Sequence, residues 1–349
     1  MKKNKIDRKN LVEVLNKLKP GLSQKAILDQ IQCFIFTGED IITYNDNISI
    51  CYPYDDIEDS FTIKSEEFLR ILENMKSDYI EVSVGKDKIH IQDNKNRANL
   101  VIGNLKEVNK YIDTLAFYDL KDDDWNKLPK DFKEAIDISI FTAAKGEFAE
   151  LFFTCLFFKG KEVISSDNQR VSIYEMKSKM DKEFLLPSDS AKHLLNFDVV
   201  EYYLDNSWIY FRTNDDIIFC SRIVSDEYPE DKAKESFNFK GEQIELPAGL
   251  IDSITSAEIL AKEYSGIGKR IDVVINKAKV ICKGEKEGIG EIESECKADI
   301  SIDKNILFSI DPIFFKEILK KTNMMKIGAD KAVFIMDKFK HLVAINFDE

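Results

Sequence analysis

The feature that most constrains the fold is a pattern that occurs three times along the chain. Three similar segments begin at Phe61, Phe184 and Phe308, which are 123 and 124 residues apart. Each segment opens with a short strand-like run led by phenylalanine, continues with a helix-like run and ends in three alternating strand-like runs joined by polar turns. A nearly constant offset over three copies indicates an internal repeat.

The first half of each repeat is also similar, although the pattern there is fainter. Helix-like segments place Leu11, Phe132 and Leu250 at corresponding positions, 121 and 118 residues apart, and apolar strand-like runs follow each of them. Each repeat therefore predicts helix, strands, helix, strands, which is an α+β domain with two helices packed on antiparallel sheets. We expect three such domains, at residues 1–120, 121–245 and 246–349.

The net charge of −13 is spread unevenly, with −3, −9 and −1 on the three expected domains. An acidic total argues against a protein that binds nucleic acid through a broad basic surface. It does not exclude a protein that gathers its lysines on one surface. The simpler interpretation is that outward helix faces are usually charged, and three glutamates in the helix-like run after Ser65 support it. The outward lysines of the predicted helices are Lys9, Lys17, Lys133, Lys316 and Lys320.

The sequence offers no pattern typical of an enzyme. The six cysteines lie far apart without a Cys-x-x-Cys pair, which is typical of reduced thiols in a cytoplasmic protein. No apolar run is long enough to cross a membrane. The three histidines are isolated, the acidic runs fall in predicted turns, and neither a nucleotide-binding glycine loop nor a nucleophile elbow occurs. We expect no catalytic site, no metal and no cofactor.

Two motifs connect the repeat with a known family. The stretch SDNQRV (166–171) resembles the family's Thr-Asp-Gly-His-Arg-Leu segment, and SRI (221–223) followed by YP (228–229) resembles its Ser-Arg-Leu and Phe/Tyr-Pro segment. The family is the bacterial-type DNA sliding clamp, the beta subunit of the replicative DNA polymerase III holoenzyme. The resemblance covers essentially the whole chain, because the motifs and the three repeats have the same order and spacing as in the family. The differences from the family motifs are typical of a divergent member.

The resemblance implies three clamp domains per chain and a homodimer that closes head to tail into a ring around double-stranded DNA. Helices would line the hole, sheets would lie outside, and the ring would tether DNA polymerase in the cytoplasm as a processivity factor for DNA replication, without a membrane. A sliding ring needs weak phosphate contacts that do not depend on base sequence. Lys25 matches a position where the family often has a DNA-contacting arginine, and the five lysines of the helix faces would add to it.

The family also has an apolar cleft between its second and third domains that receives short peptides of DNA polymerase, clamp loader and repair proteins. Closure of the dimer pairs edge strands of the first and third domains. There Ile259 and Leu260 match an apolar pair, with Leu100 as their counterpart, although ordinary core positions would explain all three equally well. The positions that match the cleft are Phe152, Ser166, Asn168, Gln169, Arg170, Val171, Pro229, Leu342 and Ala344.

The sequence departs from the family at two places that bear on function. Asn168 and Gln169 replace Gly-His at the rim of the cleft, which leaves the choice of peptide open. Ser188 and Asp189 follow Pro187, where the family often carries basic residues. The second departure keeps an alternative open, a clamp-like scaffold or decoy interaction protein that does not close on DNA.

Overall fold

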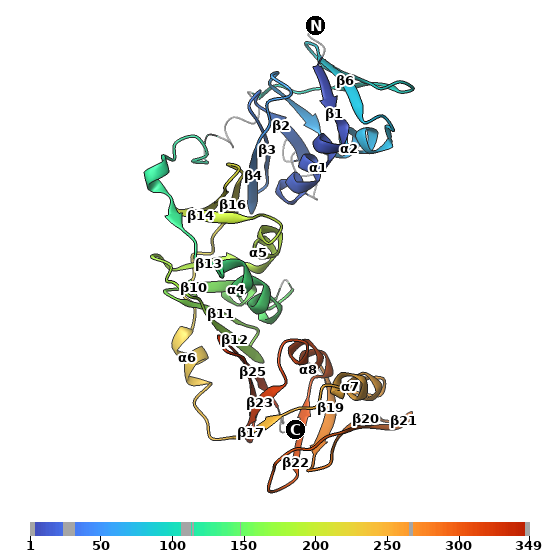
Figure 1. Cartoon of the computed structure of the whole chain (residues 1–349), viewed down its shortest axis with the longest axis vertical. Helices are drawn as coiled ribbons and strands as arrows, with labels where there is room; N and C mark the ends of the chain where they lie inside the picture. Colours follow the sequence, from blue (N-terminus) through green and yellow to red (C-terminus); the bar gives the residue numbers. More distant parts are fainter. Residues whose placement is uncertain are drawn as a thin grey trace. The chain divides into compact units, whose positions relative to one another are not determined.

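The computed structural model describes residues 4–23, 32–105, 113, 115–146, 148–264 and 268–345. The chain forms two compact units, each built from two separate segments. Unit 1 comprises residues 1–133 and 184–225, and unit 2 comprises residues 134–183 and 226–349. Helices accompany antiparallel sheets in both units (Figure 1), which confirms the predicted α+β class.

Unit 1 contains two sheets. One has the strand order β1-β6-β7-β8, and the other has eight strands in the order β5-β2-β3-β4-β16-β15-β14-β9. Its elements are β1 (Asn4–Asp7), α1 (Arg8–Leu18), η1 (Lys19–Gly21), β2 (Cys33–Phe36), β3 (Asp40–Tyr44), β4 (Ile48–Pro53), β5 (Phe61–Lys64), α2 (Ser65–Asn74), β6 (Tyr79–Val84), β7 (Lys88–Gln92), β8 (Arg97–Val101), η4 (Asp122–Asp124), β9 (Asn126–Lys127), β13 (Phe184–Pro187), α5 (Ser188–Leu194), β14 (Val199–Leu204), β15 (Trp208–Thr213) and β16 (Ile218–Arg222).

Unit 2 contains a large sheet in which the strands run in the order β10-β11-β12-β25-β24-β23-β17, and a second sheet in the order β18-β19-β20-β21 with β22 beside β19. No helix in the described ranges is long and apolar enough to cross a membrane. The elements are α4 (Phe132–Ser139, whose first two residues belong to unit 1), η5 (Ile140–Thr142), η6 (Leu151–Thr154), β10 (Cys155–Lys159), β11 (Glu162–Ser166), β12 (Arg170–Glu175), α6 (Glu230–Glu235), β17 (Glu242–Glu245), α7 (Leu250–Glu258), β18 (Lys262–Tyr264), β19 (Gly268–Ile275), β20 (Lys279–Lys286), β21 (Gly290–Lys297), β22 (Ile306–Ile310), α8 (Pro312–Leu319), β23 (Met324–Ile327), β24 (Lys331–Ile335) and β25 (Phe339–Ala344).

Strand pairing reproduces the threefold repeat. In every repeat the first strand pairs with the strand that follows the second helix, as in β1 with β6, β9 with β14 and β17 with β23. Successive repeats are joined by two further antiparallel ladders, β4 with β16 and β12 with β25. The compact units follow these ladders, so the middle repeat contributes one half to each unit. The three domain boundaries expected from the sequence stay a prediction.

Local sequence explains where the helices begin and which face they bury. The carboxylate of Asp7 accepts hydrogen bonds from the first free N–H groups of α1, and Asp311, followed by a proline, does the same for α8. Buried apolar side chains then recur at the spacing of one helix face. In α1 they are Leu11, Val14, Leu15 and Leu18. Truncating any one of the three leucines to alanine would cost about 2–5 kcal/mol.

Candidate functional site

Three of the lysines expected to contact DNA, Lys9, Lys17 and Lys133, belong to unit 1. Each of them forms an ion pair with a carboxylate. Ion pairs exposed to water are worth about 0–1 kcal/mol, so a DNA phosphate could displace the carboxylate at small cost. The nearby negative charge would still reduce the gain from that exchange. The distances between Nζ and the carboxylate oxygen are 2.7 Å for Lys9–Asp78, 3.1 Å for Lys17–Glu13 and 2.7 Å for Lys133–Asp198.

The remaining lysines are placed less uniformly. In unit 2, Lys316 pairs with Glu258 and so links α8 to α7, and this pair is largely covered, with side chains 22 % and 23 % exposed. Lys320 caps the C-terminal end of α8 and is exposed. Lys25 lies outside the described residues. The structure thus places Lys316 and Lys320 one turn apart at the end of α8. The contacts of the five described lysines do not show a group of them that could hold one phosphate together.

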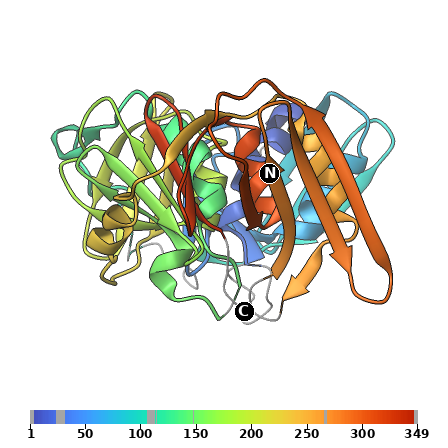
Figure 2. The ribbon, with the colours of Figure 1, turned by 90° about the horizontal axis from the view of Figure 1, so that it is seen from below.

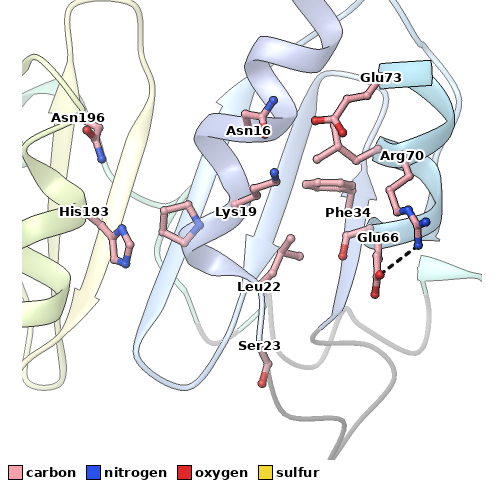
Figure 3. A pocket seen from close by; sticks show the side chains of 13 residues that line it. Asn16, Lys19, Leu22, Ser23, Phe34, Glu66, Arg70, Glu73, His193 and Asn196 are labelled. Carbon is pink, nitrogen blue, oxygen red and sulfur yellow. Dashed lines mark ion pairs between the residues drawn. The ribbon is translucent and has the colours of Figure 1, made fainter. Parts of the chain in front are cut away.

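A hollow of about 600 Å³ lies within unit 1 between α1, α2 and α5 (Figure 3). Lys19, Arg70 and His193 bring basic groups to its wall, and Glu66 and Glu73 bring acidic ones. Arg70 lies 3.6 Å from Glu66, one turn away on the same helix. Burial lowers the pKa of His193, which keeps that ring neutral at pH 7. Because charges of both signs line it, this hollow selects neither an anion nor a cation.

The motif that resembles the clamp family forms a tight turn between β11 and β12 in unit 2. The Oδ1 atom of Asp167 accepts hydrogen bonds from the N–H groups of Gln169 and Arg170 at 3.1 and 2.8 Å, which is an Asx turn. The Ser166 hydroxyl donates to the Arg170 carbonyl oxygen at 2.8 Å. Asn168 has φ = 70°, in the left-handed region that asparagine tolerates better than most residues. Asparagine can therefore stand where the resembled family has glycine.

The guanidinium of Arg170 fixes this turn against α8. It donates to Asp167 Oδ2 at 2.9 Å, to Glu317 Oε2 at 2.7 Å and to the carbonyl oxygen of Phe141 at 3.1 Å. It also lies 3.7 Å from the ring centroid of Phe314, a favourable cation–π contact. The side chain is only 7 % exposed. Arg170 therefore holds structure in place and has little surface left for a ligand.

The predicted cleft residues are divided between two faces of the large sheet. Successive side chains of a strand point to opposite faces, so Val171 points away from the face on which Arg170 meets α8. Val171 lies directly opposite Leu342 in the β12–β25 ladder, and both side chains are less than 10 % exposed. The structure brings these two apolar residues together, as a cleft floor requires, and separates them from Arg170.

The other predicted rim positions lie near the same strands. The Ala344 N–H donates to the carbonyl oxygen of Gln169 at 2.8 Å, which links the end of β25 to the turn. Phe152 meets Tyr228 edge to face with ring centroids 6.2 Å apart. Pro229 follows Tyr228 and is half-buried. The aromatic contact and the ladder hydrogen bond support a continuous rim, and the binding role of these residues stays a prediction.

A second hollow, of about 590 Å³, lies on the α8 side of the sheet in unit 2. It shares only Asn168 and Arg170 with the positions expected from the sequence. Sequence reasoning missed Ile313 and Glu317, which contribute the α8 wall. The available signal was Ile313 itself, an apolar residue that lies off the buried stripe of Phe315 and Ile318. The side chains that shape this hollow include Phe148, Phe153, Asn168, Arg170, Ile313 and Glu317.

His341 lies fully buried in β25 at the ladder that joins two repeats. Its Nδ1 atom is 2.8 Å from the Ser172 hydroxyl, which in turn is 2.6 Å from the hydroxyl of Thr142. Burial lowers the pKa of His341 well below its usual range, and the positive charges of Arg170 and Lys321 add to this effect. The folded protein therefore holds this ring in its neutral form.

We expect acid to weaken unit 2 through His341. Because the pKa is lower in the folded state, the unfolded chain binds a proton first, and stability is lost as pH falls below about 6.5, by up to ~1.4 kcal/mol per pH unit from this group. Urea unfolding between about pH 8 and pH 5 should show this slope, and His341→Gln should flatten it. His193 is retained in both proteins, so an equal slope in the variant would contradict the assignment.

Among the strands that lie at the end of a sheet in the described part of the chain, two are also the last strand of one half of a repeat. They are β8 in unit 1 and β21 in unit 2, the latter in a long hairpin drawn in orange in Figure 2. Leu100 lies half-buried in β8. Beside β21, Ile259 at the end of α7 is 72 % exposed, and Leu260 is half-buried. The three residues predicted for the dimer interface thus lie at or beside open sheet edges.

A glycine positions the end of α7. A Cβ atom at Gly284 in β20 would lie 2.0 Å from the carbonyl oxygen of Ala257 in α7, which is far inside van der Waals contact. Glycine therefore lets the helix pack directly on the strand. This close packing leaves Ile259 and Leu260 beside the open edge strand.

Comparison with known proteins gives matches only at the level of structure. No protein-family model matches the chain, and no curated protein matches its sequence. Among solved structures, the DNA polymerase III beta chain of Streptococcus pneumoniae TIGR4 superposes with a TM-score of 0.83 at 16% identity over 100% of both chains. A putative DNA polymerase III beta subunit from Eubacterium rectale gives 0.80 at 18% identity over 99% of this chain and 98% of that one.

A third structure is the Helicobacter pylori beta clamp bound to a DNA ligase peptide. It gives a TM-score of 0.80 at 14% identity and covers 99% of this chain and 100% of that one. Likeness at such low identity shows a shared fold. In these three matches the likeness covers 98–100% of each chain, and so it includes all three repeats.

Proposed function

Because this chain has the fold of the DNA polymerase III beta clamps, we propose that it is a DNA sliding clamp. Two copies would close head to tail into a ring around double-stranded DNA and tether a DNA polymerase to it in the cytoplasm. The protein would act in DNA replication as a processivity factor without a catalytic site of its own. Polymerase and clamp loader would be bound through short peptides.

The observation that carries the proposal is the pair of open sheet edges. In both ladders between repeats, the strand that ends the first half of one repeat pairs with the strand that ends the second half of the next. The third repeat offers β21 for such a ladder and the first repeat offers β8. Pairing β21 of one copy with β8 of a second copy would form a ladder of the same kind between the two copies. Two copies have two such pairs of edges, and pairing both of them closes a ring.

The chemistry of the two edges supports their pairing. Leu100 of β8 and Ile292 of β21 are half-buried residues on the inner faces of their sheets, with Ile259 and Leu260 nearby for apolar contact. The exposed face of β8 carries Arg97. The exposed face of β21 carries Glu291, Glu293 and Glu295, of which Glu293 and Glu295 also pair with Lys283 and Lys279 of β20. Opposite charges facing each other across a ladder contribute roughly 0.2–1 kcal/mol per pair.

The predicted partner surfaces are compatible with this function. Val171 and Leu342 give the apolar floor on which a short peptide could anchor, and such sites depend on one or two buried apolar side chains. A DNA ligase peptide occupies the Helicobacter pylori clamp. The lysines that face outward on α1, α4 and α8, of which four are already paired with acids, would give weak contacts that let DNA slide.

Topological retention on DNA tests the proposal. Copies separated by dilution are mixed with nicked circular DNA, concentrated, and passed over a sizing column at salt high enough to break ionic contacts. A ring should travel with the circle and be released once the DNA is cut to a linear form. Equal retention on circular and linear DNA would indicate ordinary DNA binding.

A second candidate function is a clamp-like scaffold or decoy that does not close on DNA. The observation that favours it is the charge of α2 and α7, where Glu66, Glu67, Glu73, Asp252 and Glu258 outnumber Arg70. Helices of this charge repel phosphates. A dimeric protein that never stays on the circle would favour the scaffold.

A further inference from the structure

The hollow beside α8 in unit 2 combines apolar walls with unusual exposure. Phe148 is fully exposed at its rim, and Ile313 on α8 is 46 % exposed. Phe153 and Phe314 line the interior. Leu151, 64 % exposed, lies on the segment that leads into this wall. Several large apolar side chains gathered around one hollow are typical of a surface that a partner covers.

The hollow is also acidic. Two carboxylates, Asp167 and Glu317, share the single guanidinium of Arg170 at 2.8 and 2.7 Å, so one negative charge is not neutralised by that cluster. At the rim Glu150 and Lys145 carry opposite charges and offset each other. Stacking on Phe314 and near-complete burial keep Arg170 from binding an anion. A ligand that fits must therefore be apolar with a positive charge beside the apolar part.

We propose that this hollow binds a protein segment with a bulky apolar anchor flanked by lysine or arginine. It is distinct from the predicted cleft, because the Val171–Leu342 floor lies on the opposite face of the same sheet. The two sites share only the turn at Asn168 and Arg170. The inference rests on the proposed function, because the segment would belong to a protein recruited to the clamp. That protein would occupy the predicted cleft and, in addition, the hollow beside α8. Nucleic acid is disfavoured because its phosphates would meet the carboxylates.

Two fluorescent peptides test the charge preference. They share an isoleucine-leucine-phenylalanine core and end either in two lysines or in two glutamates, and their affinity for the full chain is measured by fluorescence anisotropy at low salt. The lysine peptide should bind at least ~5-fold tighter, with the difference shrinking as salt is added. Equal binding, or tighter binding of the glutamate peptide, would overturn the proposal.

Variants locate the binding to this hollow. Glu317→Gln should bring the affinities of the two peptides close together, whereas Glu175→Gln, an exposed carboxylate at the far end of β12, should leave the preference intact. Ile313→Ser should weaken both peptides, and Leu307→Ser is the matched control because Leu307 is an exposed apolar residue of β22. Unchanged binding in Ile313→Ser would contradict the site.

Two further outcomes separate this inference from the proposed function. A labelled single-stranded oligonucleotide that bound the chain and was lost in Ile313→Ser would assign the hollow to nucleic acid and sink the proposal. If neither peptide binds, the inference is wrong, whatever the circle experiment shows. Retention on circular DNA uses no peptide, so the ring is judged independently.

Discussion

Replacing both Ile259 and Leu260 by lysine should convert the protein from a dimer to a monomer at micromolar concentration. Both residues lie beside the open edge of β21, where a second copy would cover them. Burying two ammonium groups in an apolar contact without partners should weaken association at least ~100-fold, or about 3 kcal/mol. Mass in solution, measured by light scattering or sedimentation, reports the result. The fold itself should survive, because in the single chain Ile259 is exposed and Leu260 is only half-buried.

The control for this experiment is Leu307→Lys, which places the same charge at an exposed apolar position on β22, on the opposite side of the sheet from β21. An unchanged dimer in the double variant would remove Ile259 and Leu260 from the interface. A charge exchange tests the ladder itself. Arg97→Glu should weaken the dimer, and adding Glu293→Arg and Glu295→Arg should restore part of it. An unmodified chain that is strictly monomeric would count heavily against the ring.

Loss of the Arg170 guanidinium should strongly destabilise unit 2. Arg170→Met keeps much of the apolar stem but leaves Asp167 and Glu317 facing each other without a cation, and it removes the donor to the Phe141 carbonyl. Removing one partner of a covered charge cluster in this way should lower the free energy of unfolding by about 3 kcal/mol. Urea unfolding followed by circular dichroism measures it.

Arg212 provides a matched control in unit 1. It also sits between two carboxylates, Glu201 and Asp122, and over an aromatic ring, that of Trp125 at 4.6 Å. Asp122 is almost fully exposed, so water can replace the lost cation there, and Arg212→Met should cost ~1 kcal/mol or less. A loss in Arg170→Met no larger than in Arg212→Met would show that the turn is not held by this cluster.

Much of the fold could be predicted because the pattern that specifies it is local and occurs three times. Alternation and helical periodicity mark strands and helices segment by segment, and the phenylalanines at positions 61, 184 and 308 mark the same strand in each repeat. The ladders between repeats could not be predicted this way. The register of Phe219 with Ile50 depends on surfaces that are 169 residues apart, and no local pattern records it.

The candidate site was predicted less well for the same reason. The adjacency of Val171 and Leu342 followed only from the family resemblance. Successive side chains of a strand point to opposite faces, so Arg170 and Val171 could have been assigned to opposite faces of β12 from the sequence. The family motif was compared as one unit, and this difference between neighbouring residues was not used. The ion pairs of Lys133 with Asp198 and of Arg170 with Glu317 join residues 65 and 147 positions apart, so the charge balance of both surfaces became visible only with the fold.

The division of the middle repeat between two compact units has a consequence for fragments of the chain. A piece that ends at a repeat boundary, such as residues 1–120, would retain β4 but lose β16. The edge of β4 that faces away from β3 would then lose its ladder at Ile48–Cys51. Bare edges of this kind invite aggregation or strand exchange between molecules. The sequence repeat is therefore not the unit that we expect to fold stably on its own. Excision for expression or circular permutation should respect the ladders, with cuts near residues 133, 183 and 225.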